Sequence, residues 1–90
     1  MSKSALMGWT KGLARDLGPK GITVNVIHPG PTDTDMNPAS GERADAQRAY
    51  LPIAEYGTPE DIAAFVAFVA GSEGKFINGA GLTIDGGFSI

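Results

Sequence analysis

The amino-acid sequence predicts an α/β fold in which a helix, a strand, a loop, a second helix and a second strand follow one another. Three observations support this fold class. Apolar side chains recur at helical spacing in the first segment. The run ITVNVI is rich in β-branched residues and ends at a Pro-Gly pair, as a strand does. The strand–helix–strand part has the length of a right-handed crossover between parallel strands.

The first element is predicted as a helix over residues 2–17. Apolar residues follow one face, and Gly18 with Pro19 supplies a stop signal. The expected core stripe consists of Leu6, Trp9, Leu13 and Leu17. Gly8 and Gly12 lie one turn apart, and each glycine weakens a helix by about 1 kcal/mol relative to alanine. We expect a neighbour to pack closely on the glycine face in compensation; the alternative is that the glycines only weaken the helix.

A strand is predicted over residues 22–27, followed by a loop over residues 28–56. The loop begins with a cluster of Pro, Asp, Asn and Gly, which are typical of turns. Within the loop, residues 42–50 contain good helix formers without a clear apolar face, so we expect only a weak helix there.

The second helix is predicted over residues 59–70. Thr58 can cap it and Pro59 suits the first helical position. Glu60 and Asp61 complement the positive end of the helix dipole. The expected core stripe of this helix consists of Ile62, Phe65, Val66 and Val69.

A short strand over residues 81–85 and a glycine turn complete the order. Two parallel strands with two helices form a very small sheet, whereas parallel sheets are usually covered on both faces. We therefore expect that part of the sheet lies outside these 90 residues.

Composition excludes several classes of protein. A net charge of -3 argues against a nucleic-acid partner, which needs a basic face. The longest apolar run, IAAFVAFVA, is far shorter than the ~20 residues that span a bilayer, so no membrane segment is expected. The absence of cysteine excludes disulfides and thiolate metal sites and is compatible with the cytoplasm.

Lys3 is the first candidate for chemistry. A lysine at the start of a helix faces the positive end of the helix dipole, which is unfavourable for a cation. A functional site could use that field to lower the pKa of a nearby acid. The alternative is a solvated surface lysine.

The loop HPGPTDTDMNP is the second candidate. Gly30 allows a sharp turn at the carboxyl end of a strand, where ligands bind in open α/β sheets. Thr32 and Thr34 can offer hydroxyl and backbone groups to a polar ligand. The alternative is an ordinary capping loop.

The same loop resembles the start of a calcium loop only superficially. Asp33, Asp35 and Asn37 have the spacing of the first ligands. Pro38 stands where that loop needs glycine, and Ala44 stands where it needs a bidentate glutamate. No metal site is expected.

Three further features favour structural roles. His28 is the only histidine and has no nucleophile motif near it in the sequence. Tyr50 and Tyr56 are expected in packing or at an interface. The IDGG run at 84–87 is expected to allow a close approach between strand and chain.

These segments together resemble the classical short-chain dehydrogenases/reductases. SKSALMGWTKGLARDLGPKGITVNVIHPG resembles the helix that carries that family's catalytic lysine and the sixth strand of its sheet. PGPTDTDM resembles the family's cofactor loop, and YGTPEDIAAFVAFVAGSEGKFINGAGLTIDGG resembles its last helix and seventh strand. The resemblance implies the C-terminal part of an incomplete Rossmann-like, doubly wound parallel sheet.

The resemblance implies roles for five residues. Lys3 matches the lysine of the Tyr-x-x-x-Lys pair, which lowers the pKa of the tyrosine and binds the nicotinamide ribose. Pro29 and Gly30 would place the cofactor loop. The backbone of Thr32, where the family more often has Val or Ile, would meet the nicotinamide carboxamide. The Thr34 hydroxyl would contact the carboxamide or the pyrophosphate.

The family's catalytic tyrosine would stand before Met1, and its catalytic serine and glycine-rich dinucleotide fingerprint are not among these 90 residues. The resemblance therefore implies the C-terminal third of an NAD- or NADP-dependent alcohol/ketone oxidoreductase. We expect the 90-residue chain alone to be inactive and to bind neither cofactor tightly. The alternatives are an interaction module and a small binding protein unrelated to redox chemistry.

The family is commonly tetrameric, and its lysine-bearing helix and its last helix and strand form subunit interfaces. The resemblance thus implies a homo-oligomer. Residues 36–52 match the family's variable substrate lid, and their small polar side chains suggest a modest polar carbonyl or alcohol substrate.

Overall fold

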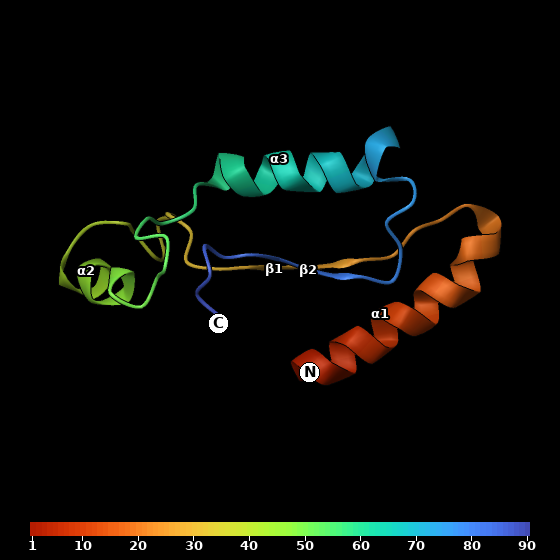
Figure 1. Ribbon diagram of the computed structural model, residues 1–90, viewed down its shortest axis with the longest axis horizontal. Coiled ribbons are helices and arrows are strands. Elements are labelled where there is room, and N and C mark those ends of the chain that lie inside the picture. Colours follow the sequence, from red (N-terminus) through yellow and green to blue (C-terminus); the bar gives the residue numbers. More distant parts are fainter. The chain divides into compact units, whose positions relative to one another are not determined.

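The computed structural model of the protein describes residues 1–90 and contains three α-helices, two short 3₁₀ helices and two strands. Figure 1 shows these elements coloured along the sequence, with β1 and β2 side by side. The chain divides into two compact units, which are described separately. The first comprises residues 1–27 and 66–82, and the second comprises residues 28–65 and 83–90.

Helix α1 spans Lys3–Leu17 and begins one residue later than predicted. Ser2 is its N-cap, because the Ser2 hydroxyl accepts a hydrogen bond of 3.1 Å from the N–H of Ala5. The predicted stop at Gly18 is only a tightening of the helix, since Gly18–Lys20 continues as the 3₁₀ helix η1. Pro19 fits there because the first turn of a helix needs no N–H at that position.

The buried face of α1 differs from the predicted stripe. Thr10 is 2% exposed and Ala14 5%, whereas Trp9 is 60% exposed, so the expectation of a core tryptophan is wrong for this chain. The cause is the turn at residues 77–80. A side chain on Gly79 would lie 3.4 Å from the Ala14 Cβ, so small residues let the turn approach the helix.

The two strands pair in one sheet. Strand β1 spans Val26–Pro29, and strand β2 spans Gly81–Ile84. The N–H of Val26 donates to the carbonyl of Ala80 (2.9 Å), and the N–H of Gly30 donates to the carbonyl of Ile84 (3.0 Å). Both partners advance in the same direction, so the strands are parallel. The predicted α/β class with a parallel sheet is confirmed.

The predicted bounds of the first strand, 22–27, are wrong. Before Val26 the regular ladder is interrupted, because side-chain amides bond several of the backbone groups, although the Val24 carbonyl accepts from the N–H of Gly79 (2.8 Å). The Val24 N–H donates to the Asn78 side-chain oxygen (3.0 Å). The Asn25 amide donates to the carbonyl of Ile77 and accepts from the N–H of Ala80, both at 3.0 Å. Strand β2 also ends one residue before the prediction, which leaves residue 85 in the following turn.

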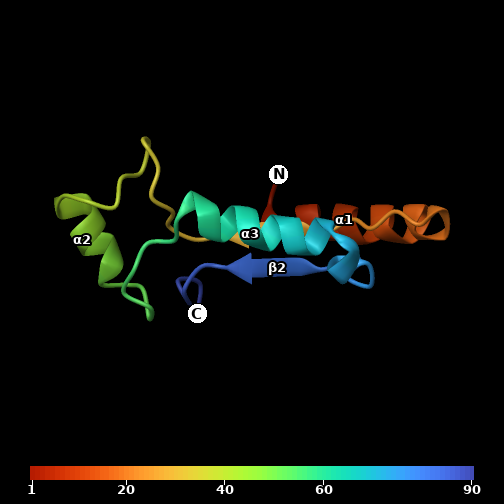
Figure 2. The same ribbon diagram turned by 90° about the horizontal axis from the view of Figure 1, so that it is seen from above.

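Two helices lie between the strands in the sequence. Helix α2 spans Glu42–Arg48, helix α3 spans Pro59–Ala70, and η2 spans Ser72–Gly74. Figure 2 shows α2 as a short helix within the long connection that leads from β1 to α3. The prediction of a weak helix at 42–50 is confirmed with shorter bounds, and the predicted bounds of the second helix agree with α3.

Few hydrophobic side chains are buried. In the first unit Val69 is buried, whereas Val66 of the predicted stripe is exposed. In the second unit Ala44, Leu51 and Tyr56 form a small cluster. No helix has the length and apolar character needed to cross a bilayer. That the chain forms one part of a single larger domain stays a prediction.

Candidate functional site

The second unit contains the loop that follows β1. Pro29 is the last residue of β1, and the N–H of Gly30 still donates to the carbonyl of Ile84. A side chain at residue 30 would lie 2.5 Å from the Asp85 Cβ and 2.7 Å from the Asp85 Cα. Only glycine therefore allows the start of this loop to lie against the end of β2.

Thr32 lies in a parallel bridge with Gly57. The bridge uses the N–H groups of Asp33 and Gly57, which donate to the carbonyls of Gly57 and Pro31, each at 2.9 Å. In this pattern the N–H and C=O of Thr32 itself point away from Gly57. The Thr32 hydroxyl donates to the carbonyl of Gly30 (2.9 Å), which braces the turn. The Thr32 backbone is therefore fixed, with its donor and acceptor directed outward.

Thr34 is exposed and forms a tight turn with Asn37. The Thr34 hydroxyl accepts a hydrogen bond of 3.2 Å from the N–H of Asn37. The Asp33 carboxylate accepts one of 2.8 Å from the N–H of Ala39. These local bonds hold the loop beyond Thr32, while the Thr34 hydroxyl proton remains available for donation to a ligand.

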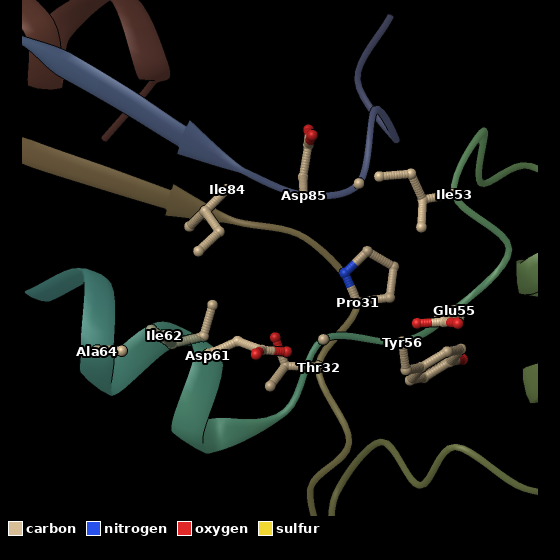
Figure 3. Close-up of a pocket in the computed structure, with 12 residues that line it drawn as sticks. Pro31, Thr32, Ile53, Glu55, Tyr56, Asp61, Ile62, Ala64, Ile84 and Asp85 are labelled. Atoms are coloured by element: carbon tan, nitrogen blue, oxygen red, sulfur yellow. The ribbon is translucent and has the colours of Figure 1, made fainter.

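A cavity of about 340 Å³ lies beside this loop in the second unit. Its walls come from the loop after β1, the segment before α3, the first turns of α3 and the end of β2, as Figure 3 shows. The apolar and aromatic residues that line it include Pro31, Ile53, Tyr56, Ile62 and Ile84. The cavity lies at the carboxyl ends of the two parallel strands, which is where open α/β sheets bind ligands.

Tyr56 connects the cavity with α2. It is buried and lines the cavity, and its hydroxyl donates to the side-chain oxygen of Gln47. The guanidinium of Arg48 lies over its ring, 5.1 Å from the ring centre, and also bonds the carbonyl of Ala39 and the carboxylate of Asp45. The expectation that Tyr56 packs is confirmed.

Tyr50, grouped with Tyr56 in the sequence analysis, is exposed. His28 is half-buried within β1. Reasoning from the sequence missed Ile53, Tyr56 and Asp85 as residues around the cavity. Only Asp85 carried a signal, because the IDGG run already indicated a close approach to another part of the chain.

Lys3 belongs to the first unit, where it is the first residue of α1 and is exposed. It shares a face of α1 with Thr10, two turns later. The other predicted site residues, Pro29, Gly30, Thr32 and Thr34, all belong to the second unit. Pro29 ends β1, and the other three lie in the loop that follows it.

The loop after β1 offers small polar donors and acceptors. No group of three or more His, Cys, Asp or Glu residues is arranged to hold a metal ion. A carboxamide needs one acceptor and one donor side by side, and the outward N–H and C=O of Thr32 provide both. The loop's small polar groups thus fit the carboxamide end of a nicotinamide cofactor.

Comparison with known proteins agrees with the fold. Residues 1–89 match the sequence pattern of the protein family described as Enoyl-(Acyl carrier protein) reductase. A relative from Escherichia coli strain K12, named as a cyclic-di-GMP-binding biofilm dispersal mediator protein, is 54% identical over 97% of this chain and 37% of its own length.

Solved structures are equally similar. The short-chain dehydrogenase/reductase from Serratia marcescens BCRC 10948 is 58% identical with a TM-score of 0.92, over 98% of this chain and 36% of that one. A short-chain dehydrogenase from Burkholderia cenocepacia J2315, solved with NADP, is 67% identical with a TM-score of 0.89, over the same shares.

The chain spans just over a third of the length of these relatives. Its match nevertheless covers almost all of its own residues, from α1 to the turn after β2. The sequence match and the parallel Rossmann-type arrangement show that the chain belongs to the short-chain dehydrogenase/reductase family of oxidoreductases.

Proposed function

We propose that this chain supplies the C-terminal part of the site of an NAD- or NADP-dependent oxidoreductase that interconverts small alcohols and carbonyl compounds. The observation that carries the proposal is the fixed backbone of Thr32, with its N–H and C=O directed outward beside a cavity at the carboxyl ends of the strands. The NADP in the Burkholderia cenocepacia structure supports the choice of cofactor class.

Each residue has a defined role in this proposal. The bound nicotinamide supplies or accepts the hydride. Thr32 would hold the carboxamide through its backbone and so orient the nicotinamide, and the Thr34 hydroxyl would donate to the carboxamide or the pyrophosphate. Lys3 donates to the ribose, and its positive charge favours ionisation of a nearby phenol.

The test uses the complete oxidoreductase that carries these residues. We expect Lys3→Ala to lower kcat/KM for carbonyl reduction by at least about 10²-fold, because the loss of the Lys3 side chain weakens acid–base catalysis. Lys11→Ala is the matched control, since Lys11 is exposed on the same helix and forms no ion pair with an acid of the chain. Equal activity of the two variants would refute the role of Lys3.

The 90-residue chain alone is expected to bind nicotinamide cofactors negligibly. It offers contacts for the nicotinamide end only, and the glycine-rich fingerprint that holds the pyrophosphate is not among its residues. Fluorescence of the single tryptophan, Trp9, during titration with the reduced cofactor is the measurement. Saturable binding in the micromolar range would contradict this expectation.

A second candidate function is self-association. The exposed Trp9 and the uncovered Gly8 and Gly12 on α1 favour it, because no atom outside the surrounding helix backbone lies within 4 Å of a side chain built on either glycine. A second copy of this chain, or a longer chain of the same family, would cover that surface.

A further inference from the structure

Three chain segments meet around the cavity of the second unit. The loop 30–34 follows β1, the segment 52–57 precedes α3, and the turn 85–89 follows β2. Figure 3 shows Pro31 and Thr32 of the first segment, and Ile53, Glu55 and Tyr56 of the second, near Asp85. The turn after β2 contacts both of the others, and Asp85 is its first residue.

The Asp85 carboxylate closes this turn. One oxygen accepts a hydrogen bond of 2.8 Å from the N–H of Gly87, and the other accepts one of 3.1 Å from the N–H of Ser89. The Asp85 carbonyl accepts a third from the N–H of Phe88 (3.1 Å). Only a carboxylate offers two acceptor oxygens in this geometry, because the amide nitrogen of asparagine cannot accept.

The backbone of the same residue forms the wall on which the loop 30–34 rests. The Gly30 N–H donates to the carbonyl of Ile84, directly before Asp85. A side chain at Gly30 would overlap the Asp85 Cα and Cβ, at 2.7 and 2.5 Å. In Figure 3 the side chain of Asp85 points to the side opposite that of Ile84. Asp85 therefore contacts Gly30 with its backbone and the turn with its carboxylate.

The other side of the turn holds the segment 52–57. The Ile53 N–H donates to the carbonyl of Gly86 (3.1 Å). Pro52 lies against Gly87, where a side chain would come within 2.9 Å of the Pro52 ring. Gly86 and Gly87 have φ of 62° and 90°, a conformation that glycine adopts most readily. The conformation of the turn thus sets the position of residues 52 and 53.

The ring of contacts closes at Thr32. The segment 52–57 ends at Gly57, which bonds the residues on both sides of Thr32. We propose that Asp85 is a positioning residue: by fixing the turn 85–89, it holds the loop 30–34 directly through Gly30 and a second time through residues 52–57. The inference rests on the proposed function, in which the Thr32 backbone meets the nicotinamide carboxamide.

The first test measures the position of the loop without reference to activity. In the complete oxidoreductase, Asp85→Ala and Asp85→Asn are compared with Asp16→Ala, which removes an exposed carboxylate from α1. Amide hydrogen exchange of Asp33 and Gly57, whose N–H groups form the bridge around Thr32, should become about tenfold faster in Asp85→Ala and less so in Asp85→Asn, which keeps one acceptor. It should be unchanged in Asp16→Ala. Unchanged exchange in both Asp85 variants would overturn the proposal.

The second test links the position to the cofactor. The KM for the nicotinamide cofactor should rise about tenfold in Asp85→Ala, while the KM for the carbonyl substrate at saturating cofactor stays within about twofold. A general loss of folded protein would lower kcat and leave both KM values unchanged, and that result would overturn the positioning role. If Asp85→Ala does not fold, Asp85→Asn carries the same comparison with a smaller shift.

The two proposals fail in different ways. If the unsubstituted protein shows no turnover with either nicotinamide cofactor, the proposed function fails, whereas faster exchange at Asp33 and Gly57 in Asp85→Ala still supports positioning of the loop. If the unsubstituted protein is active and the exchange rises without any change in cofactor KM, the role of Asp85 toward the cofactor is refuted and the proposed function stands.

Discussion

Gly30 and Asp85 approach each other so closely that no side chain fits between them. The overlap would involve Asp85 backbone atoms at 2.7 and 3.0 Å, which cannot move aside as the end of a flexible side chain can. This contact ties the start of the loop 30–34 to the end of β2. Thr32, two residues later, depends on it in the proposed function, where Thr32 would meet the cofactor through its backbone and not through its side chain.

We expect Gly30→Ala to lower the free energy of unfolding by about 1–3 kcal/mol, the usual cost of overpacking. Gly18→Ala is the matched control. Its new side chain would lie 3.7 Å from the nearest atom of Asn78, and its backbone is helical, so its effect should be neutral or stabilising by up to about 1 kcal/mol. Urea denaturation of both variants is the measurement, and equal midpoints would argue against a close contact at residue 30.

At the scale of elements, α3 begins with a reciprocal pair of hydrogen bonds. The Asp61 N–H donates to the Thr58 hydroxyl (3.1 Å), and the Thr58 N–H donates to the Asp61 carboxylate (2.9 Å). This arrangement satisfies a backbone donor of the first turn and fixes the direction in which the chain enters the helix. Asp61 and Ile62 also line the cavity, so the cap places one of its walls.

We expect Thr58→Ala to cost about 1 kcal/mol of stability, because an N–H of the first turn loses its partner. Ser4→Ala serves as the control, since Ser4 is exposed in α1 and its hydroxyl has no hydrogen bond within the chain. Unfolding in urea distinguishes the two. A control that loses as much stability as Thr58→Ala would show that the cap contributes nothing specific.

Elements whose signals are local in the sequence could be predicted, whereas features set by contacts between distant residues could not. The signals for α3 are local, and its bounds agree with the prediction. The first strand was misplaced because its ladder is delayed by Asn78, which bonds Val24 across 54 residues of sequence. The buried face of α1 was misjudged for the same reason, since the distant turn at Gly79 selects Ala14 and not the apolar stripe. The cavity walls at Ile53 and Tyr56 likewise arise from contacts that no local pattern reports.

At the scale of the whole molecule, too little apolar surface is covered. The chain exposes 6332 Å², whereas a folded monomer of its mass would expose about 5,000 Å². No large side chain is fully buried. The large hydrophobic residues that are exposed include Trp9, Ile22, Val66, Phe68, Phe76 and Phe88. Such a chain gains stability from any partner that binds its folded form alone.

We therefore expect the folded chain to associate with itself in solution. Stable interfaces bury about 800 Å² per partner, which is of the order of the excess surface of this chain. The glycine face of α1 is the surface on which a partner can come closest, because no atom outside the surrounding helix backbone lies within 4 Å of a side chain added at Gly8 or Gly12. Sedimentation equilibrium over a hundredfold range of concentration should give a mass above that of the monomer.

Gly12→Leu separates this surface from the rest of the molecule. Leucine has a higher helix propensity than glycine, so the substitution should stabilise α1. Its side chain should block close approach of a partner. We expect the dissociation constant of the oligomer to rise at least about tenfold, which corresponds to about 1.4 kcal/mol. Lys75→Leu, an exposed substitution after η2, should leave association unchanged. A well-ordered monomer at every concentration would show that the 90 residues cover their own apolar surface. An unchanged dissociation constant in Gly12→Leu would place the contact between copies on another face.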